Sequence, residues 1–269
     1  MSEQPNFLGK IIETKRQRLA RAMAERPLAD VRAAALVVRR TATAQVLRAA
    51  LSRAEQLNII AEIKRASPSK GDLRRDLEPA EVARAYQAGG AAAISVLTEE
   101  DYFLGSTADL RAVRATVALP LLRKDFIVDG WQVYESAAAG ADALLLIVAA
   151  LTDEQLTHLR WLAEDELHMD ALVEVHTLSE LRRAEACGAQ IIGVNNRNLH
   201  TFSVNIETSV DLIRARRTGA RFVSESGLRT SSDLQRLRAL GYNGFLIGET
   251  LMRADDAAAT LRALREQYV

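Results

Sequence analysis

Two charged side chains interrupt an otherwise apolar run: Glu62 and Lys64 stand within Ile59–Lys64. Side chains alternate along a β-strand, so these two would point to the same face. Charges on a buried face are costly unless they are paired or used. Pro68 and Gly71 follow and favour a polar turn. The segment indicates the edge of an active site, and a purely structural Glu–Lys ion pair is the alternative interpretation.

Charged and polar side chains follow other apolar runs in the same way. A single such residue would by default be interpreted as part of a buried salt bridge. Several of them at equivalent positions on different predicted strands favour a functional interpretation. Interleaved opposite charges can hold an anion while keeping a carboxylate free as a base. Charge attraction favours protonated lysines, whereas burial lowers the pKa of a lysine, and the sequence leaves this balance open. The set comprises Glu62, Lys64, Lys124, Glu174, Asn195, Arg197, Glu225 and Ser226.

Glycines follow the last two apolar runs, where Ser226-Gly227 and Gly248-Glu249 stand. Glycine lets backbone N–H groups approach a ligand, and a helix beginning after Gly248 can direct its N-terminus at an anion. These positions predict a phosphate site to which Glu249 contributes only its backbone. A pair of ordinary tight turns is the alternative.

Apolar residues near the same strand ends are candidates for the wall of a ligand site. Phe103, Phe126, Leu145 and Ile147 qualify, although each also fits a core position, and Phe103 is the best candidate because it lies in a loop. The histidines show no metal-ligand spacing. His176 follows Glu174 and could face the pocket, but a surface turn is favoured.

These residues need a scaffold that brings strand ends together. Helical segments alternate with the predicted strands, and several helices end at a glycine. The strands are almost continuously apolar, as expected for strands covered on both faces. The predicted strands are Ile59–Lys64, Ala91–Thr98, Leu119–Phe126, Ala141–Val148, Asp170–Val175, Ile191–Asn196, Arg221–Gly227 and Gly244–Glu249.

Eight such strand–helix units predict a closed (β/α)8 TIM barrel, whose chemistry lies at the carboxyl ends of its strands. An open doubly wound sheet is disfavoured because the first turn lacks a G-x-G-x-x-G motif. Residues 1–269 are expected to form a single domain, with a helical extension over 1–55 and the barrel over 56–269. Within the extension, one helix should end at Pro27 and a second should cover Thr43–Ala54.

Composition excludes several classes of partner. The formal net charge is zero, so no overall field attracts nucleic acid or an anionic membrane. The longest apolar run, Ala143–Leu151, is too short to span a bilayer. Cys187 is the only cysteine and the N-terminus lacks the pattern of a signal peptide, which together predict a cytoplasmic protein. The sequence leaves the oligomeric state open, and a monomer is compatible with it.

Several motifs resemble the indole-3-glycerol phosphate synthase family of tryptophan biosynthesis, in family order from about residue 7 to 253. They are AEIKRASPSKG, SVLTEEDYFLGS, LRKDFIVD, ADALLLIV, LVEVHT, IGVNNRNL, SESG and FLIGETLM. The resemblance implies a phosphate-binding barrel with an N-terminal helical segment. It also implies ring closure of 1-(2-carboxyphenylamino)-1-deoxyribulose 5-phosphate, a small phosphosugar substrate, with loss of carbon dioxide and water and without cofactor or metal.

The resemblance also assigns site residues. The implied catalytic residues are Glu62, Lys64, Lys124, Glu174, Asn195, Glu225 and Ser226. The implied substrate contacts are Ser67, Pro68, Phe103, Phe126, Leu145, Ile147, Arg197 and Leu199. The implied phosphate contacts are Ser226, Gly227, Gly248 and Glu249, although family members often carry serine where this chain has Glu249.

The chemistry of that reaction suggests individual roles. Lys124 is expected to protonate the alkoxide that forms on ring closure, and Lys64 to hold the substrate carboxylate. Glu174 is expected to act as the base of the dehydration, with a lysine as its acid. Two alternatives remain at this stage: another phosphosugar barrel such as an isomerase of the same pathway, which would need a single acid–base pair, and a non-catalytic phosphosugar-binding regulator.

Overall fold

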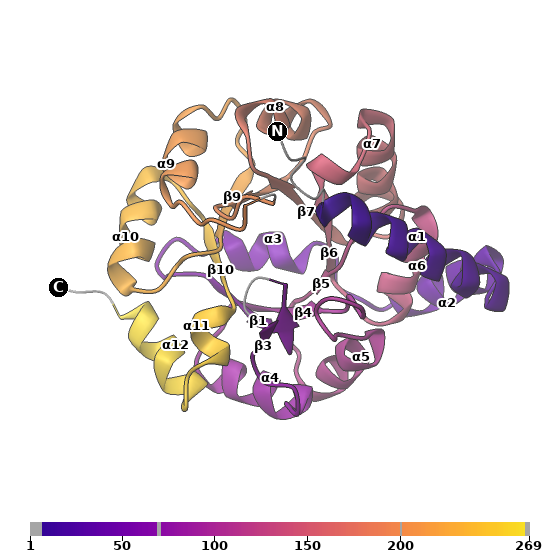
Figure 1. The fold of residues 1–269 in the computed structure, drawn as a ribbon, viewed down its shortest axis with the longest axis horizontal. Helices are drawn as coiled ribbons and strands as arrows, with labels where there is room; N and C mark the ends of the chain where they lie inside the picture. The colour runs from indigo at the N-terminus through magenta and orange to yellow at the C-terminus, as the bar shows by residue number, and fades with distance from the viewer. Residues whose placement is uncertain (1–6, 69–70, 200, 267–269) are drawn as a thin grey trace.

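Eight parallel strands close into a barrel in the computed structural model of the chain (Figure 1). The structure describes residues 7–68, 71–199 and 201–266. Around the barrel the strands follow the order β1-β10-β9-β8-β7-β6-β5-β4. The predicted TIM barrel is therefore confirmed. The barrel strands are β1 (Ile59–Ile63), β4 (Ala93–Leu97), β5 (Leu121–Lys124), β6 (Ala143–Ile147), β7 (Asp170–Val175), β8 (Ile191–Asn195), β9 (Arg221–Glu225) and β10 (Gly244–Ile247).

Helices follow the strands and form the outer layer seen in Figure 1. Many begin at a Ser, Thr or Asp whose side chain accepts a hydrogen bond from the first turn, which satisfies an otherwise unpaired N–H group. The helices are α4 (Pro79–Ala88), α5 (Thr107–Thr116), α6 (Gly130–Ala138), α7 (Asp153–Trp161), α8 (Leu178–Ala186), α9 (Glu207–Arg214), α10 (Ser231–Leu240), α11 (Glu249–Met252) and α12 (Ala257–Arg265), with short turns η1 (Val148–Ala150) and η2 (Leu162–Glu166).

The N-terminal extension contains α1 (Phe7–Glu25), α2 (Leu28–Arg39) and α3 (Val46–Leu51). Helix α1 ends just before Pro27, as expected, but α2 lies in a stretch for which no separate helix was predicted. Helical spacing was recognised through this stretch, but nothing marked it as a helix of its own; it packs against α6 and buries Val31 and Ala35. The predicted second helix is present as α3, shorter than expected.

The amino-terminal end of the barrel is closed by α3, which lies behind the centre of the barrel in Figure 1. Leu47 and Leu51 of this helix are fully buried and join an inner apolar cluster with side chains from the barrel strands. Gly244 leaves room for this plug, because an added Cβ would lie 2.4 Å from Leu51 Cδ2. A larger cluster fills the space between the strands and the surrounding helices.

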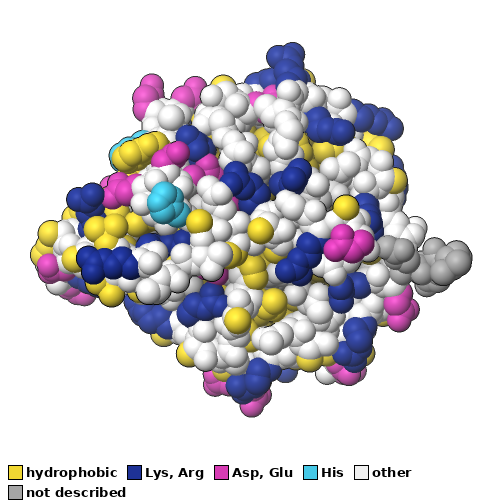
Figure 2. Space-filling view, turned by 180° about the vertical axis from the view of Figure 1, so that it is seen from behind, with side chains coloured by type: hydrophobic (Ala, Val, Ile, Leu, Met, Phe, Trp, Pro, Cys, Tyr) yellow, Lys and Arg dark blue, Asp and Glu magenta, His cyan; other side chains and the backbone are white. Residues whose placement is uncertain are grey.

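The turn after β1 forms a small antiparallel hairpin of β2 (Ala66–Ser67) and β3 (Gly71–Asp72), while Ser69 and Lys70 lie outside the described residues. The face shown in Figure 2 carries Lys and Arg side chains spread over its surface rather than gathered into one patch. In the described part of the chain, no helix combines the length and the apolar character needed to cross a bilayer.

Candidate active site

A cavity of about 650 Å³ opens at the carboxyl ends of the barrel strands. Every site residue predicted from the sequence lines it, so groups from all parts of the barrel converge on one space. These residues are Glu62, Lys64, Ser67, Pro68, Phe103, Lys124, Phe126, Leu145, Ile147, Glu174, Asn195, Arg197, Leu199, Glu225, Ser226, Gly227, Gly248 and Glu249.

Lys124 lies at the centre of the buried charges. Its Nζ is 3.0 Å from Glu174 Oε2, to which it donates a hydrogen bond, and 3.1 Å from Glu225 Oε2. The contact with Glu225 is an ion pair without hydrogen-bond geometry, and both oxygens of that carboxylate are buried without a hydrogen-bond donor among the described residues. One lysine therefore serves two carboxylates, and only one of them is well satisfied.

The pKa shifts in this trio follow from burial and charge. Burial would lower the pKa of Lys124, but the carboxylates of Glu174 and Glu225 outweigh it and raise that pKa. Burial would raise the pKa of Glu174, whereas the charges of Lys124 and His176 lower it below its ordinary value. Attraction thus decides the balance that the sequence left open. An ionised carboxylate and a protonated amine lie side by side, as a base and an acid must.

Glu225 behaves differently from Glu174. Burial raises the pKa of Glu225 to about 7, Glu174 adds to this rise by repulsion, and Lys124 opposes it. The two carboxylates compete for one lysine, so their environments push their pKa values apart. Such a separation is typical of groups with different roles in one site.

Glu62 and Lys64 form the pair that the alternation in β1 predicts, with 2.6 Å between Lys64 Nζ and Glu62 Oε1. The strand β10 beside them supplies Gly248 at its end, where an added Cβ would lie 2.3 Å from Glu62 Oε1 and 2.9 Å from Lys64 Nζ. A glycine is needed here because any side chain would displace the pair.

The adjoining rim, after β9, is shaped by strained backbone. Ser226 has a φ of 67° and Gly227 a φ of 81°, both in the left-handed region, where serine is uncommon. Asn196 holds this turn by donating from Nδ2 to the carbonyl oxygen of Ser226 at 3.0 Å. Across the rim, the Glu249 carboxylate is 3.4 Å from Arg253 Nε and 3.9 Å from Arg197 Nη2, so arginines face its negative charge.

Apolar side chains cover the rest of the cavity wall. The rings of Phe103 and Phe126 lie 6.3 Å apart, and Leu145 and Ile147 are buried on the inner face of β6. Helix α1 adds Phe7, whose ring packs edge-on against Tyr102 and Phe202 with centroids 5.2 Å away in each case. No pattern in the sequence indicated that the extension would reach the cavity.

A buried ion pair fixes α1 to the barrel beside Lys124. Lys15 Nζ is 2.7 Å from Asp125 Oδ1, and Arg123 Nη2 is 3.0 Å from Asp125 Oδ2. Burial opposes the ionisation of Asp125, but Arg123 and Lys15 lower its pKa to about 2. The charged residue that follows Lys124 in the chain therefore attaches the extension to the barrel at the edge of the same cavity.

Three residues with structural importance were missed or misjudged. Gly193 gives space to Glu225, since an added Cβ would lie 2.1 Å from Glu225 Oε1; a glycine inside an apolar strand is a signal of such close approach. Asn196 received no role from the sequence. His176 lies in the bend after β7, but the favoured surface position is wrong, because its side chain is only 10 % exposed and its Nε2 lies 3.4 Å from Glu174 Oε1.

Across residues 7–68, 71–199 and 201–266, no group of three or more His, Cys, Asp or Glu side chains is placed to hold a metal ion. The cavity places Lys64 beside Glu62, and Lys124 beside both Glu174 and Glu225.

Solved structures with a similar fold include 3-hexulose-6-phosphate synthase from Salmonella typhimurium, with a TM-score of 0.61 and 15% identity over 77% of this chain and 96% of that one. Thiamine phosphate pyrophosphorylase from Pyrococcus furiosus has a TM-score of 0.58 and 18% identity over 81% of this chain and 95% of that one. At these identities the likeness concerns the fold alone.

Sequence relatives are much closer. The chain is 47% identical to the indole-3-glycerol phosphate synthase of Carboxydothermus hydrogenoformans over 96% of this chain and 99% of that protein. It is 45% identical to that of Aromatoleum aromaticum over 96% and 98%, respectively. The family model for indole-3-glycerol phosphate synthase matches residues 8–264. The chain therefore belongs to the indole-3-glycerol phosphate synthase family.

Proposed function

We propose that the charged cavity at the carboxyl ends of the strands is the active site and that Lys124 and Glu174 are its acid and base. The enzyme is a carboxy-lyase of tryptophan biosynthesis. It converts 1-(2-carboxyphenylamino)-1-deoxyribulose 5-phosphate to indole-3-glycerol phosphate by ring closure, decarboxylation and dehydration. The observation that carries the proposal is the Lys124–Glu174 contact of 3.0 Å inside the cavity.

Ring closure needs an acid. The ring carbon that bears the carboxylate attacks the ribulose carbonyl, and the carbonyl oxygen becomes an alkoxide that must receive a proton. Lys124 is suited to this step because nearby carboxylates raise its pKa and keep it protonated. Lys124 extends from β5 to Glu174 of β7 and Glu225 of β9, which places its ammonium inside the cavity.

Decarboxylation follows from the same intermediate. Attack removes the aromaticity of the benzene ring, and loss of carbon dioxide restores it. Lys64 is our candidate for holding the substrate carboxylate until that loss, with Glu62 fixing the ammonium at 2.6 Å. The side chain of Lys64 is partly exposed to the cavity, so a carboxylate can approach it.

Dehydration needs a base for a carbon-bound proton of the new ring and an acid for the departing hydroxyl. Glu174 fits the base, because Lys124 and His176 keep its pKa low and its carboxylate ionised. Asn195 lines the same cavity as Glu174 and is proposed to orient it. A lysine supplies the acid, and both Lys124 and Lys64 are within the same cavity. Glu225 supports Lys124 through its charge.

The remaining contacts seat the substrate. Backbone groups at Ser226, Gly227, Gly248 and Glu249 are proposed to receive the phosphate, the usual phosphate position in barrels of this kind. Glu249 contributes its backbone, while the arginines beside it balance its side chain. The proposed contacts to the rest of the substrate are Ser67, Pro68, Phe103, Phe126, Leu145, Ile147, Arg197 and Leu199.

We also propose that residues 1–55 form one domain with the barrel over 56–269. The buried Lys15–Asp125 pair and the packing of α2 on α6 support this, since both join the extension to the barrel. A cytoplasmic location remains a prediction from the cysteine content and the N-terminal sequence.

The direct test is to add the carboxyphenylamino-deoxyribulose phosphate to the purified protein and record indole fluorescence together with release of carbon dioxide. Equimolar formation of both products is expected. Binding of the substrate without either product would contradict the proposed roles of Lys124 and Glu174.

A further inference from the structure

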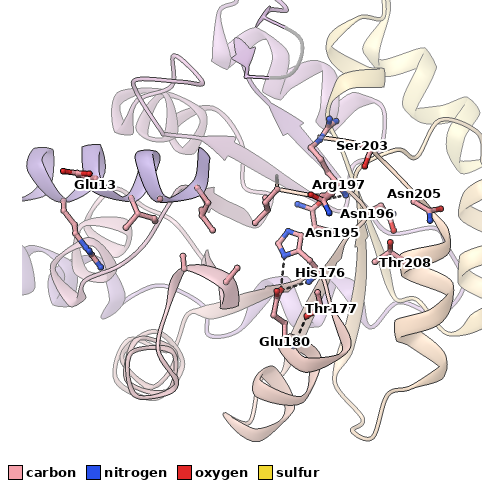
Figure 3. Close-up of a pocket in the computed structure, with 18 residues that line it drawn as sticks. Glu13, His176, Thr177, Glu180, Asn195, Asn196, Arg197, Ser203, Asn205 and Thr208 are labelled. Carbon is pink, nitrogen blue, oxygen red and sulfur yellow. Dashed lines mark hydrogen bonds and ion pairs between the residues drawn. The ribbon is translucent and has the colours of Figure 1, made fainter. Parts of the chain in front are cut away.

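A second, polar cavity lies beside the active site, with a volume of about 1020 Å³. It is bounded by α1, by the segment after β7 and by the segment after β8. Figure 3 shows the ring of His176 in this cavity, between Glu180 on one side and Asn195 on the other. Asn195 lines both cavities, so only a thin wall of side chains separates them.

His176 connects the two cavities through its two ring nitrogens. Its Nδ1 lies 3.1 Å from Glu180 Oε2, and its Nε2 lies 3.4 Å from Glu174 Oε1. Lys124 hydrogen-bonds to the other oxygen of Glu174, so Oε1 is the oxygen that faces His176. The Nε2 atom is buried and has no hydrogen-bond partner among the described residues. From the active site outward, the exposed fraction of the side chain rises from 2 % for Glu174 to 10 % for His176 and 16 % for Glu180.

The reaction requires a proton from water. The carbonyl oxygen takes up one proton when the new carbon–carbon bond forms and a second when it departs as water. A carbon of the newly formed ring gives one proton back, to the base. The carboxylate leaves as carbon dioxide and gives none. Each turnover therefore consumes one proton net. A bound substrate would occupy the main cavity during these steps, so a path from the side cavity could deliver this proton without crossing the substrate.

We propose that Glu180 and His176 form a proton relay that delivers protons from the side cavity to Glu174 and Lys124 in the active site. A proton from water passes to Glu180, then to His176 Nδ1, while His176 Nε2 releases a proton to Glu174 Oε1. Glu174 passes it on to Lys124 across their hydrogen bond. Each passage leaves the ring proton on Nδ1, so His176 must return to its Nε2–H tautomer by proton exchange with water before the next passage. This inference rests on the proposed roles of Glu174 and Lys124.

The charges around His176 favour such a carrier. Burial would lower the pKa of His176, but its contact with Glu180 and the charge of Glu174 raise it above the ordinary histidine value. Glu225 on β9 acts in the same direction. Glu13, Arg16 and Arg197 line the same cavity and set the wider field. An imidazole whose two nitrogens face Glu180 and Glu174 can take up a proton at one nitrogen and release one at the other.

The test is turnover of His176→Ala with added imidazole near pH 7. We expect kcat to fall at least ~10-fold with KM changed less than ~3-fold, because general acid–base groups commonly contribute ~100-fold or more. Imidazole should restore kcat several-fold in proportion to its concentration. Wild-type turnover should not respond to imidazole.

Further variants separate the relay from a packing role. His176→Gln keeps the space filled and serves if the alanine variant does not fold; it should show a similar fall in kcat. Glu180→Gln, at the outer end, should lower kcat by a smaller factor. His158→Ala, at an exposed histidine on α7, should leave kcat unchanged.

Wild-type kcat in both His176 variants would overturn the relay. So would a loss in His176→Ala that imidazole does not restore, since that indicates support of Glu174 rather than proton transfer. Failure of the proposed function looks different, because Lys124→Ala and Glu174→Gln would then retain activity whatever His176 does.

Discussion

The two ends of the barrel use the same strands for opposite purposes. At the amino-terminal end, Leu47 and Leu51 of α3 enter the barrel and complete an apolar cluster. At the carboxyl-terminal end, β5, β7 and β9 place Lys124, Glu174 and Glu225 in a buried cluster of charge. One end has satisfied packing, and the other has charged groups with incomplete partners.

The apolar end therefore contributes stability, and the charged end contributes the chemistry. Buried charge with incomplete partners lowers stability, because desolvation exceeds what one shared lysine can return. The Glu225 oxygens, buried without a hydrogen-bond donor among the described residues, are the clearest case. The apolar plug contributes stability at a distance from the substrate. Substitutions at the two ends should therefore affect different measurements.

The largest expected effect is on turnover at the charged end. Lys124→Ala and Glu174→Gln should each lower kcat by at least ~100-fold, because each removes a proton-transferring group, with only modest loss of substrate binding. Steady-state assays of indole formation measure both quantities. Lys10→Ala, at an exposed lysine on α1, is the control and should retain wild-type kcat. Near-wild-type turnover in either variant would refute the role of that residue.

At the opposite end, Leu51→Ala should lower the free energy of unfolding by about 2–5 kcal/mol, because it empties a fully buried leucine site. Its kcat at a temperature where it remains folded should match wild type. Urea unfolding and kinetic assays check the two statements. Leu36→Ala, on the exposed face of α2, should change stability by less than ~0.5 kcal/mol. A large loss of kcat in folded Leu51→Ala would break the separation of the two ends.

A smaller effect on kcat/KM is expected at Gly248, whose backbone lies against the Glu62–Lys64 ion pair. Gly248→Ala places a methyl group 2.3 Å from Glu62 Oε1, so the Glu62–Lys64 pair must move. We expect kcat/KM to fall about 10-fold, a cost typical of a displaced substrate-positioning group. Gly219→Ala, where an added Cβ has no neighbour within 4 Å, should leave kcat/KM unchanged. Equal behaviour of the two variants would argue against a tight approach at Gly248.

The smallest effect concerns pH. The pKa of Glu225 rises from its ordinary value of 4.5 to about 7 on folding, so between these values the native state binds more protons than the unfolded chain. The contribution of Glu225 to stability is present at low pH and is lost as pH rises through 7. Glu225→Gln lacks this loss, and its stability relative to wild type should increase from pH 5 to pH 8. Urea unfolding at each pH measures both proteins. A difference in free energy of unfolding between Glu225→Gln and wild type that stays constant from pH 5 to pH 8 would contradict the raised pKa.

The sequence predicted the barrel and the convergence of its strand ends because apolar runs alternate regularly with helices and each run ends in polar groups. Helix α2 was not distinguished as a separate helix, because helical spacing runs through its stretch and its packing on α6 is a tertiary feature. The place of His176 was misjudged, since a histidine two residues beyond Glu174 carries no signal about which way the chain turns. The reach of Phe7 into the cavity depends on how α1 packs, which no local pattern encodes.

The most direct test of the account is a crystal structure of Glu174→Gln with the carboxyphenylamino-deoxyribulose phosphate bound. We predict that the phosphate lies beside Gly227 and Gly248, the substrate carboxylate contacts Lys64, and Lys124 Nζ lies within hydrogen-bond distance of the ribulose oxygen. A phosphate bound away from both glycines, or a ribulose oxygen out of reach of Lys124, would contradict it.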